Sequence, residues 1–557
     1  MARSRQLPRH SAHHSTRYWA VAAVAALGLA LAGCGKPHDE KPPTNDGLGA
    51  AAPAATTKVD SVAWNLPNEP RSLDPVKVFS GAELTVNANV CESLLTFTPD
   101  GDLKPGLATS IDTSDPTTYV VHLREGVKFS NGDPMTAQDV VFSLNRVMDP
   151  KSGSYYSGFA TKVDRIEATD PSTVTITMTA PDVVFYRMLA TPMGQVVQQS
   201  AAEQAGKAFG TAQGGIVCTG PYTVASWKHG DNLTVEANDN WWGLADHPLL
   251  TQQVKFTFIS NDSTAASALT NGDVDGTFTV PGGAALTKLT EGSDGTLYLG
   301  PSTAQLVLVP TQLNGDSPLA DPQVRQALAD SIDYEGILSS IYNPTGESLR
   351  AIVPPGAFGY AKDTFQSAYD ALPEPTLDID SAKRLLAEAG QPHPSITIGV
   401  PASVDDYVNV AEAIQSNAKA AGFEVKIDSM SDADFYPLYS SAKARAKVDA
   451  FITDWFVDIP DPLVLYAEIA TPGSAVDFGG YDDPEVAGLL DQARGTFDDE
   501  QRAKLVVEAQ KSITEDQVWL PIVYELGTLF LSNDLGGATS ASPYNLYAPW
   551  IADLGAR

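Results

Sequence analysis

The order of apolar and polar residues predicts a chain that alternates strands with helices. The clearest strand signal is residues 173–178, Thr-Val-Thr-Ile-Thr-Met, where every second side chain is apolar. We expect all of 163–178 to form one half-buried antiparallel strand. Shorter alternating runs predict strands at 108–111 and 119–123, each with one face on a core.

Capping residues predict where helices begin and end. Thr136 is followed three residues later by Asp139, which is the spacing of a capping box. Asp321 followed by Pro322 predicts a second helix start, because Asp is a good N-cap and Pro is accepted at the first helical position. Gly390 predicts the end of a helix over 380–389.

Strand and helix signals alternate again in the second half of the chain. Residues 395–400 and 423–427 have the composition of strands and flank a helical pattern at 408–421. This order predicts a βαβ unit with two parallel strands. Together the two halves indicate an α/β protein.

The stretch 451–462 contains β-branched and aromatic residues interrupted by two carboxylates, before prolines end it. If it is extended, Asp454, Phe456 and Asp458 share one face, and Thr453, Trp455 and Val457 share the other. The two carboxylates are then roughly 13 Å apart, too far for an acid/base pair but suited to two parts of one ligand. The alternative is an edge strand whose aspartates face water.

Length and charge limit the classes of function. A chain of 557 residues is too long for one hydrophobic core, so we expect two or three large units. The formal net charge of −32 argues against nucleic acid as a partner. It favours a cationic or neutral ligand, although an adaptation for solubility explains the same charge.

The N-terminus indicates export. Four arginines and no acid precede an apolar run at 19–32, whose length fits a signal peptide rather than a membrane span. The run ends in Leu31-Ala32-Gly33-Cys34, which resembles a bacterial lipobox. We therefore expect a signal peptide at 1–33, a lipid on Cys34, and a flexible tether over 34–58 that holds the protein at the outer face of the cytoplasmic membrane. An ordinary signal peptide is the alternative.

Cys91 and Cys218 remain once Cys34 is assigned to lipidation. An exported chain meets an oxidising compartment, where a pair of cysteines can form a disulfide. The sequence does not give the distance between them, so two buried thiols are the alternative.

Seven phrases of the sequence, in this order, resemble the extracytoplasmic solute-binding proteins of family 5, the oligopeptide- and dipeptide-binding class of ABC importers. They identify the fold better than the ligand, because most are turns and helix caps. They are Ser72 to Pro75, Leu123 to Pro134, Thr219 to Tyr222, Asn271 to Asp275, Val324 to Leu328 with Ile332-Asp333, Trp455 to Pro462, and Gly480 to Val486.

The resemblance implies a two-lobed α/β fold of the periplasmic binding protein type, in its large class with an extra subdomain. A hinge would close the two lobes on a ligand in the cleft between them. The expected parts are lobe one at 59–299, its extra subdomain at about 95–211, lobe two at 300–519, and a segment at 520–557 that returns to lobe one.

The resemblance also implies a ligand site. Asp458 takes the place of the aspartate that pairs with the α-ammonium of a bound peptide. Residues 454–456, with Trp455 and Phe456, match the strand that adds the peptide backbone as a further strand. Phe79, Ser80 and Gly81 match a second backbone-contacting segment on the facing lobe. Ile459 replaces the usual Tyr and Asp454 is an additional acid, which leaves open whether Asp454 contacts the ligand.

These features predict a substrate-binding lipoprotein that captures short peptides and delivers them to an ABC permease and ATPase complex. The alternative within the fold is a non-peptide solute, such as an oligosaccharide, a metal chelate or another amine-bearing compound. A repurposed fold that recruits a signalling partner also remains open. We expect a monomer.

An enzyme is not expected. The chain has neither Gly-x-Ser-x-Gly nor His-Glu-x-x-His, and no cofactor or metal site is indicated. The histidines outside the signal peptide lie in separate segments, at His38, His122, His229, His247 and His393.

Overall fold

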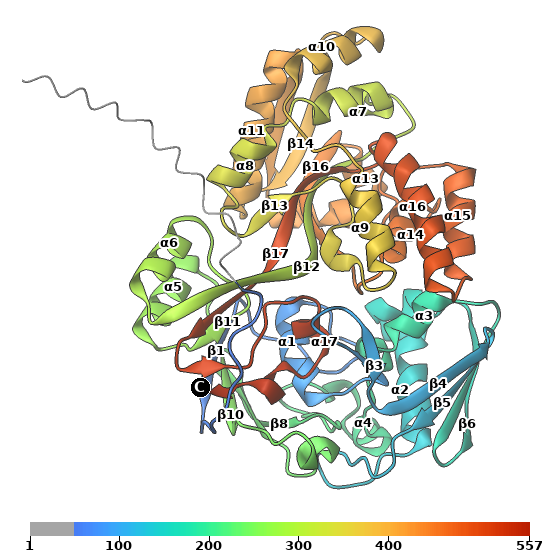
Figure 1. Cartoon of the computed structure of the whole chain (residues 1–557), viewed down its shortest axis with the longest axis vertical. Helices are drawn as coiled ribbons and strands as arrows, with labels where there is room; N and C mark the ends of the chain where they lie inside the picture. The colour runs from blue at the N-terminus through green and yellow to red at the C-terminus, as the bar shows by residue number, and fades with distance from the viewer. Residues whose placement is uncertain (1–48) are drawn as a thin grey trace, which may run out of the picture. The chain divides into compact units, whose positions relative to one another are not determined.

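The structure is a computed structural model that describes residues 49–557 (Figure 1). The predicted signal peptide, Cys34 and residues 34–48 of the predicted tether lie outside the described residues. The remainder of that tether, residues 49–58, is not free: Ala51 and Thr57 form β-bridges to Thr539 and Ala556, so the tether prediction is wrong for these residues. Within residues 49–557 no helix has the length and apolar character needed to cross a membrane.

One mixed sheet organises the described part of the chain. Two long antiparallel strands, β12 and β17, lie at its middle and run side by side (Figure 1). Their register shifts between Gly300 and Ala304, next to the predicted limit between the lobes. The order across the sheet is β15 (Glu424–Met430), β14 (Ser395–Pro401), β16 (Ala450–Phe456), β12 (Gly295–Pro310), β17 (Leu520–Ser532), β11 (Gly276–Thr277), β1 (Val62–Leu66), β10 (Gln253–Phe258), β9 (Asn232–Ala237) and β8 (Tyr222–Lys228), and β13 (Gly346–Ser348) also pairs with β17.

Helices surround this sheet and a smaller one. Helices α8, α10 and α11 lie beside β14, while α1 and α17 lie near β1 (Figure 1). The helices are α1 (Gly81–Val90), α2 (Ala137–Met148), α3 (Val183–Met188), α4 (Gln199–Ala205), α5 (Asp262–Asn271), α6 (Gly283–Gly292), α7 (Pro322–Ala329), α8 (Tyr334–Ser340), α9 (Lys362–Asp370), α10 (Ile379–Glu388), α11 (Asp405–Ala421), α12 (Asp432–Phe435), α13 (Ala442–Arg445), α14 (Pro462–Ala470), α15 (Pro484–Arg494), α16 (Asp499–Glu515) and α17 (Tyr544–Tyr547).

The local helix signals are confirmed. Thr136 caps α2, and Asp139 completes the capping box. Asp321 caps α7, with Pro322 at its first position. Gly390 follows α10 with φ of 68°, the left-handed conformation that glycine adopts without strain.

The predicted βαβ unit is also confirmed. Strands β14 and β15 are parallel, and α11 connects them and packs on the same core. The apolar side chains of all three elements are fully or largely buried there, which explains why their pattern was readable from the sequence.

The prediction of a single strand over 163–178 is wrong, because the structure divides this stretch into a hairpin of two strands. Strands β6 (Val163–Asp170) and β7 (Thr173–Met178) are antiparallel neighbours in a four-stranded sheet with β4 (Ala108–Asp115) and β5 (Thr118–Leu123). Pro171 cannot donate to a ladder, and the N–H of Ser172 donates to Asp170 Oδ1 instead. The turn therefore interrupts the alternating pattern.

The helix α3 region contacts the helices that follow β16 through buried ion pairs. Arg494 at the end of α15 binds Asp182, the N-cap of α3, with Nε 3.0 Å from Oδ1. Arg187 of α3 lies 3.4 Å from Asp461, the N-cap of α14, and donates to the carbonyl oxygen of Pro460. Both carboxylates are fully buried, so each depends on its arginine for charge compensation.

A disulfide joins Cys91, after α1, to Cys218, before β8. The two Cα atoms are 5.0 Å apart, and the residues are separated by 127 positions in sequence. Between them lie the four-stranded sheet and helices α2 to α4. The short strands β2 (Leu95–Phe97) and β3 (Leu103–Pro105) start this segment.

A separate two-stranded sheet lies near the C-terminus, where β18 (Leu535–Gly536) pairs with β19 (Gly555–Ala556).

We expect the double variant Cys91→Ala, Cys218→Ala to lower the free energy of unfolding by about 2–4 kcal/mol, because the unfolded chain regains the entropy of a long loop. Urea unfolding checks this. Wild-type protein unfolded with a reductant is the matched control and should lose the same amount. An unchanged unfolding midpoint in the variant would contradict the prediction.

Candidate functional site

The stretch 451–462 does not stay extended throughout. Strand β16 ends at Phe456, and Asp461 caps α14 by accepting from the N–H of Leu463. Asp454 is exposed, whereas Asp458 lies in the connection and is only 3% exposed. The expectation that Asp454, Phe456 and Asp458 share one strand face is therefore wrong. Pro460, Pro462 and the N-cap Asp461 start helix α14 soon after Asp458, so the strand does not continue through Asp458.

Asp458 is a buried carboxylate without a cation. Its Oδ2 accepts a hydrogen bond of 2.9 Å from Tyr155 Oη, while Oδ1 is buried and has no hydrogen-bond partner among the described residues. Burial raises the pKa of Asp458 to about 7, and the hydrogen bond from Tyr155 opposes this rise. A cation beside Oδ1 would compensate the charge that burial makes costly.

A second acid, Glu468 of α14, lies near Asp458. Burial and the negative charge of Asp458 raise the pKa of Glu468 well above its ordinary value. The two carboxyls therefore do not readily ionise together at neutral pH, and a bound cation would favour the ionised form of both.

Tyr155 brings two of the predicted residues together. It comes from the short 3-10 helix Tyr155–Ala160, 303 positions before Asp458. Its ring lies 6.0 Å from the ring of Phe79, centroid to centroid. Phe79 is 50% exposed and Tyr155 is 42% exposed, so both rings are accessible. Sequence reasoning missed Tyr155, whose only signal is the Tyr155-Tyr156 pair after a Ser-Gly-Ser turn.

The segment 79–81 is built as a helix cap. Ser80 caps α1, and the carboxylate of Glu83 accepts from the N–H groups of Phe79 and Ser80. Those two backbone donors are therefore occupied. The Phe79 ring remains exposed, and a Cβ placed on Gly81 would meet no atom within 4 Å. This segment offers an aromatic ring and open space to a ligand.

Strand β16 has a partly open edge. It pairs with β12 along its length, but with β14 only at Ala450 and Phe451 among the described residues. The N–H of Val457 donates to Thr303 on β12, so the backbone groups of Asp454 and Phe456 face the other edge. The N–H of Asp454 donates to Tyr407 Oη at 2.9 Å, and that hydroxyl in turn donates to Asp454 Oδ1.

Trp455 points to the opposite face of β16. Its ring packs against an aromatic cluster, with centroid distances of 6.1 Å to Tyr439, 5.8 Å to Phe478 and 5.7 Å to Trp519. This packing holds β16 in place. Phe456 faces the other way and is 38% exposed, so of the two rings it is the more accessible.

Asp454 lies in an acidic region with Glu525 and Asp406, of which the sequence indicated only Asp454. Burial raises the pKa of Glu525 on β17 to about 8, and the charges of Asp454 and Asp406 add to the rise. Tyr407 and Tyr342 lie among these acids, and burial with the nearby negative charges raises their pKa values. No group of His, Cys, Asp or Glu side chains in residues 49–557 is arranged to hold a metal ion.

Residues 102–476 match the family model described as bacterial extracellular solute-binding proteins, family 5 Middle. The chain is similar to the periplasmic oligopeptide-binding protein OppA of Escherichia coli, with 24% identity over 90% of this chain and 94% of that protein. It is also similar to the dipeptide-binding protein DppE of Bacillus subtilis, with 26% identity over 93% of this chain and 95% of that protein.

The fold is that of solved periplasmic binding proteins with two lobes. The ABC transporter-associated protein DppA of Helicobacter pylori, solved in complex with the peptide STSA, aligns with a TM-score of 0.73 and 22% identity. The alignment covers 90% of this chain and 98% of that structure. The predicted α/β fold class is thereby confirmed.

We expect Tyr155→Phe to lower the free energy of unfolding of the ligand-free protein by about 1–2 kcal/mol at pH 8, because a buried ionised carboxylate loses its hydrogen-bond donor. At pH 5.5 the loss should be smaller, since Asp458 is then largely protonated. Urea unfolding at the two pH values measures both numbers. Tyr436→Phe, at a side chain that is 62% exposed, is the matched control and should change neither. An equal loss at both pH values would contradict the assigned interaction.

Proposed function

We propose that this chain, which belongs to the bacterial extracellular solute-binding proteins of family 5, captures short peptides in its interlobe cleft and delivers them to an ABC permease and ATPase complex. The observation that carries the proposal is the buried Asp458, whose Oδ1 has no hydrogen-bond partner within residues 49–557. The α-ammonium of a peptide supplies the positive charge and the donors that this oxygen lacks.

The surroundings of Asp458 suit the rest of a peptide. Tyr155 presents an accessible ring next to the carboxylate, and the exposed ring of Phe79 lies beside that of Tyr155. The backbone of Phe456 faces the open edge of β16, where an extended ligand can add as a short further strand. The neighbouring N–H of Asp454 is already bound to Tyr407, so strand addition would be centred on Phe456.

The non-peptide alternatives are not favoured. An oligosaccharide carries no cation to compensate Asp458, and a metal chelate would leave the open edge of β16 unused. The curated relatives named above are peptide-binding proteins by name, which supports the same choice. As a solute-binding protein of this family the chain is not an enzyme.

The proposal extends to anchoring and domain organisation. The lipobox ending in Cys34 and the Pro- and Gly-containing stretch over 34–48 support a lipid-anchored, extracytoplasmic protein. The register shift of β12 and β17 near residue 300 supports lobes at 59–299 and 300–519, with the C-terminal segment returning to the first. A monomer would then present its cleft to the permease directly.

Asp458→Asn should weaken the binding of free-amine peptides by about 1.5–3 kcal/mol, because the ammonium loses its charge-assisted partner. Isothermal titration calorimetry against a short peptide and its N-acetylated form measures the effect. The wild type should discriminate strongly between the two, and the variant should not. Asp428→Asn, at an exposed position on β15, is the matched control. Equal affinity of wild type and Asp458→Asn for the free peptide would remove the assigned role.

Peptide affinity should also depend on pH. Below pH 7 the raised pKa of Asp458 leaves the carboxyl largely protonated and unable to pair with an ammonium. Affinity should therefore rise from pH 5.5 to 7.5, by up to about tenfold per pH unit on the acid side, and then level off. Titrations across this range check the profile. Asp458→Asn should flatten it, whereas a flat profile for the wild type would contradict the proposal.

A further inference from the structure

A basic groove borders the candidate peptide site. It has a volume of about 1060 Å³ and begins at Phe79 and Tyr155. Three segments form its walls: residues 71–79, the end of α2 with the turn at 149–155, and the loop at 206–211. None of its lining residues comes from the part of the chain after residue 211. The groove and the peptide site share Phe79 and Tyr155, and Tyr155 Oη lies 2.9 Å from Asp458 Oδ2.

The charge of this groove is opposite to that of the whole protein. The chain has 36 basic and 68 acidic side chains, yet the groove collects more cations than carboxylates. Its five cations against three carboxylates leave a net charge of two positive units. The cations are Arg71, Lys77, Arg146, Lys151 and Lys207, and the carboxylates are Asp74, Glu83 and Asp149.

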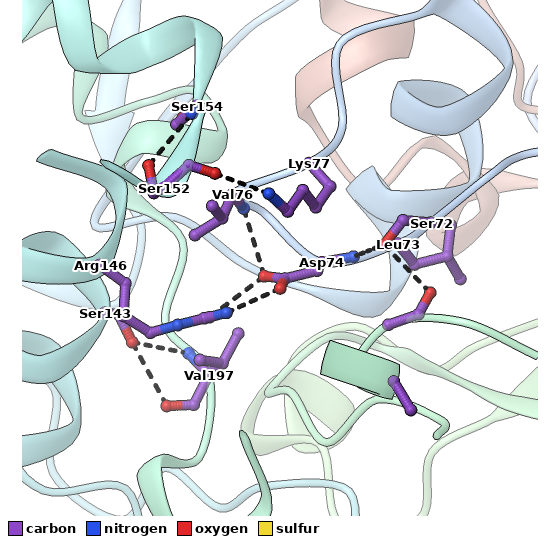
Figure 2. Close-up of polar contacts among 12 residues, drawn as sticks. Ser72, Leu73, Asp74, Val76, Lys77, Ser143, Arg146, Ser152, Ser154 and Val197 are labelled. Carbon is purple, nitrogen blue, oxygen red and sulfur yellow. Dashed lines mark hydrogen bonds and ion pairs between the residues drawn. The ribbon is translucent and has the colours of Figure 1, made fainter. Parts of the chain in front are cut away.

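Two of the carboxylates are fully engaged with arginines. Asp74 receives hydrogen bonds from both terminal nitrogens of Arg146, at 3.1 and 2.7 Å, and from the N–H of Val76 (Figure 2). Glu83 binds Arg71 Nε at 2.9 Å and completes the α1 cap. These pairs cancel their own charges and fix the groove wall.

The three lysines have no carboxylate partner. Lys77 Nζ donates to the carbonyl oxygen of Ser152 at 2.6 Å, as Figure 2 shows. Across residues 49–557, no acidic side chain lies within ion-pair distance of Lys77, Lys151 or Lys207. Asp149 accepts from the backbone N–H of Lys151, as the N-cap of a short turn, and not from its ammonium. The ammonium groups therefore remain available to a ligand.

Ser154 provides an independent sign of a missing partner. The residue lines the groove and is 5% exposed, and its N–H donates to Ser152 Oγ at 3.1 Å (Figure 2). Its own hydroxyl is buried and has no hydrogen-bond partner in the described part of the chain. A buried hydroxyl in this state costs free energy unless a ligand accepts its hydrogen bond.

We infer that this groove is a second ligand site, which binds a small oxyanion carrying two or more negative charges, of the polycarboxylate or phosphate-ester class. The ammonium groups match the charge of such an anion, and the unpartnered hydroxyl of the groove-lining Ser154 is an additional donor. The negative charge of the rest of the protein disfavours a long polyanion. The inference does not depend on the peptide function.

Calorimetry with pyrophosphate and with citrate, at constant ionic strength, tests the site. The variant Lys77→Gln, Lys151→Gln, Lys207→Gln should bind the preferred anion at least about tenfold more weakly than the wild type. The matched control is Lys383→Gln, Lys419→Gln, Lys443→Gln, which removes the same charge from exposed positions elsewhere and should stay within about twofold. Equal weakening in both variants, or no binding of either anion to the wild type, would overturn the inference.

Ser154→Ala refines the test, because it changes no charge. It should weaken anion binding by about threefold or more while leaving the melting temperature unchanged or higher, since an unpartnered buried hydroxyl is removed. Asp458→Asn should not weaken anion binding, whatever it does to peptide binding, because it removes no cation from the groove. Full competition between the anion and a peptide would place the anion in the peptide cleft and overturn the assignment of a separate site.

Discussion

The pairing of β12 with β17 is the constraint on which the rest of the structure depends. These two strands make one sheet continuous from β15 to β8, so the groups on either side of them are placed by a single hydrogen-bonded ladder. Strand β16 is attached to β12 over its full length, and the turn that carries Asp458 follows directly. The position of the buried carboxylate is thus set by the ladder and not by a flexible loop.

Contacts away from the ladder complete this placement. Asp182 with Arg494, and Asp461 with Arg187, join α3 to the helices after β16 through charges that cannot remain buried alone. Tyr155 contacts Asp458 with its hydroxyl group. The protein therefore compensates Asp182 and Asp461 with arginines, but gives Asp458 only a neutral hydroxyl. Under the proposed function a ligand provides the missing positive charge, which would be a source of both affinity and selectivity.

Local features were predictable from the sequence, and long-range ones were not. The capping box at Thr136 and Asp139 and the start of α7 at Asp321 depend on neighbours within four residues, which one sequence contains. The sequence predicted a strand that continues to Asp458, because the alternation of side chains continues past Phe456. In the structure the strand ends at Phe456. The resemblance singled out Asp458, but its contact with Tyr155 joins residues 303 positions apart, and no periodicity encodes such a pair. The basic groove was missed for the same reason, since its lysines come from three separate segments.

The bridge between Cys91 and Cys218 limits how far the segment between them can separate from the main sheet. It holds the two ends of this segment 5.0 Å apart, after α1 and before β8. If the ion pairs of α3 break, the ends of the segment therefore stay attached at one place. Local opening of the wall that carries Tyr155 can thus reverse without a search for its original position.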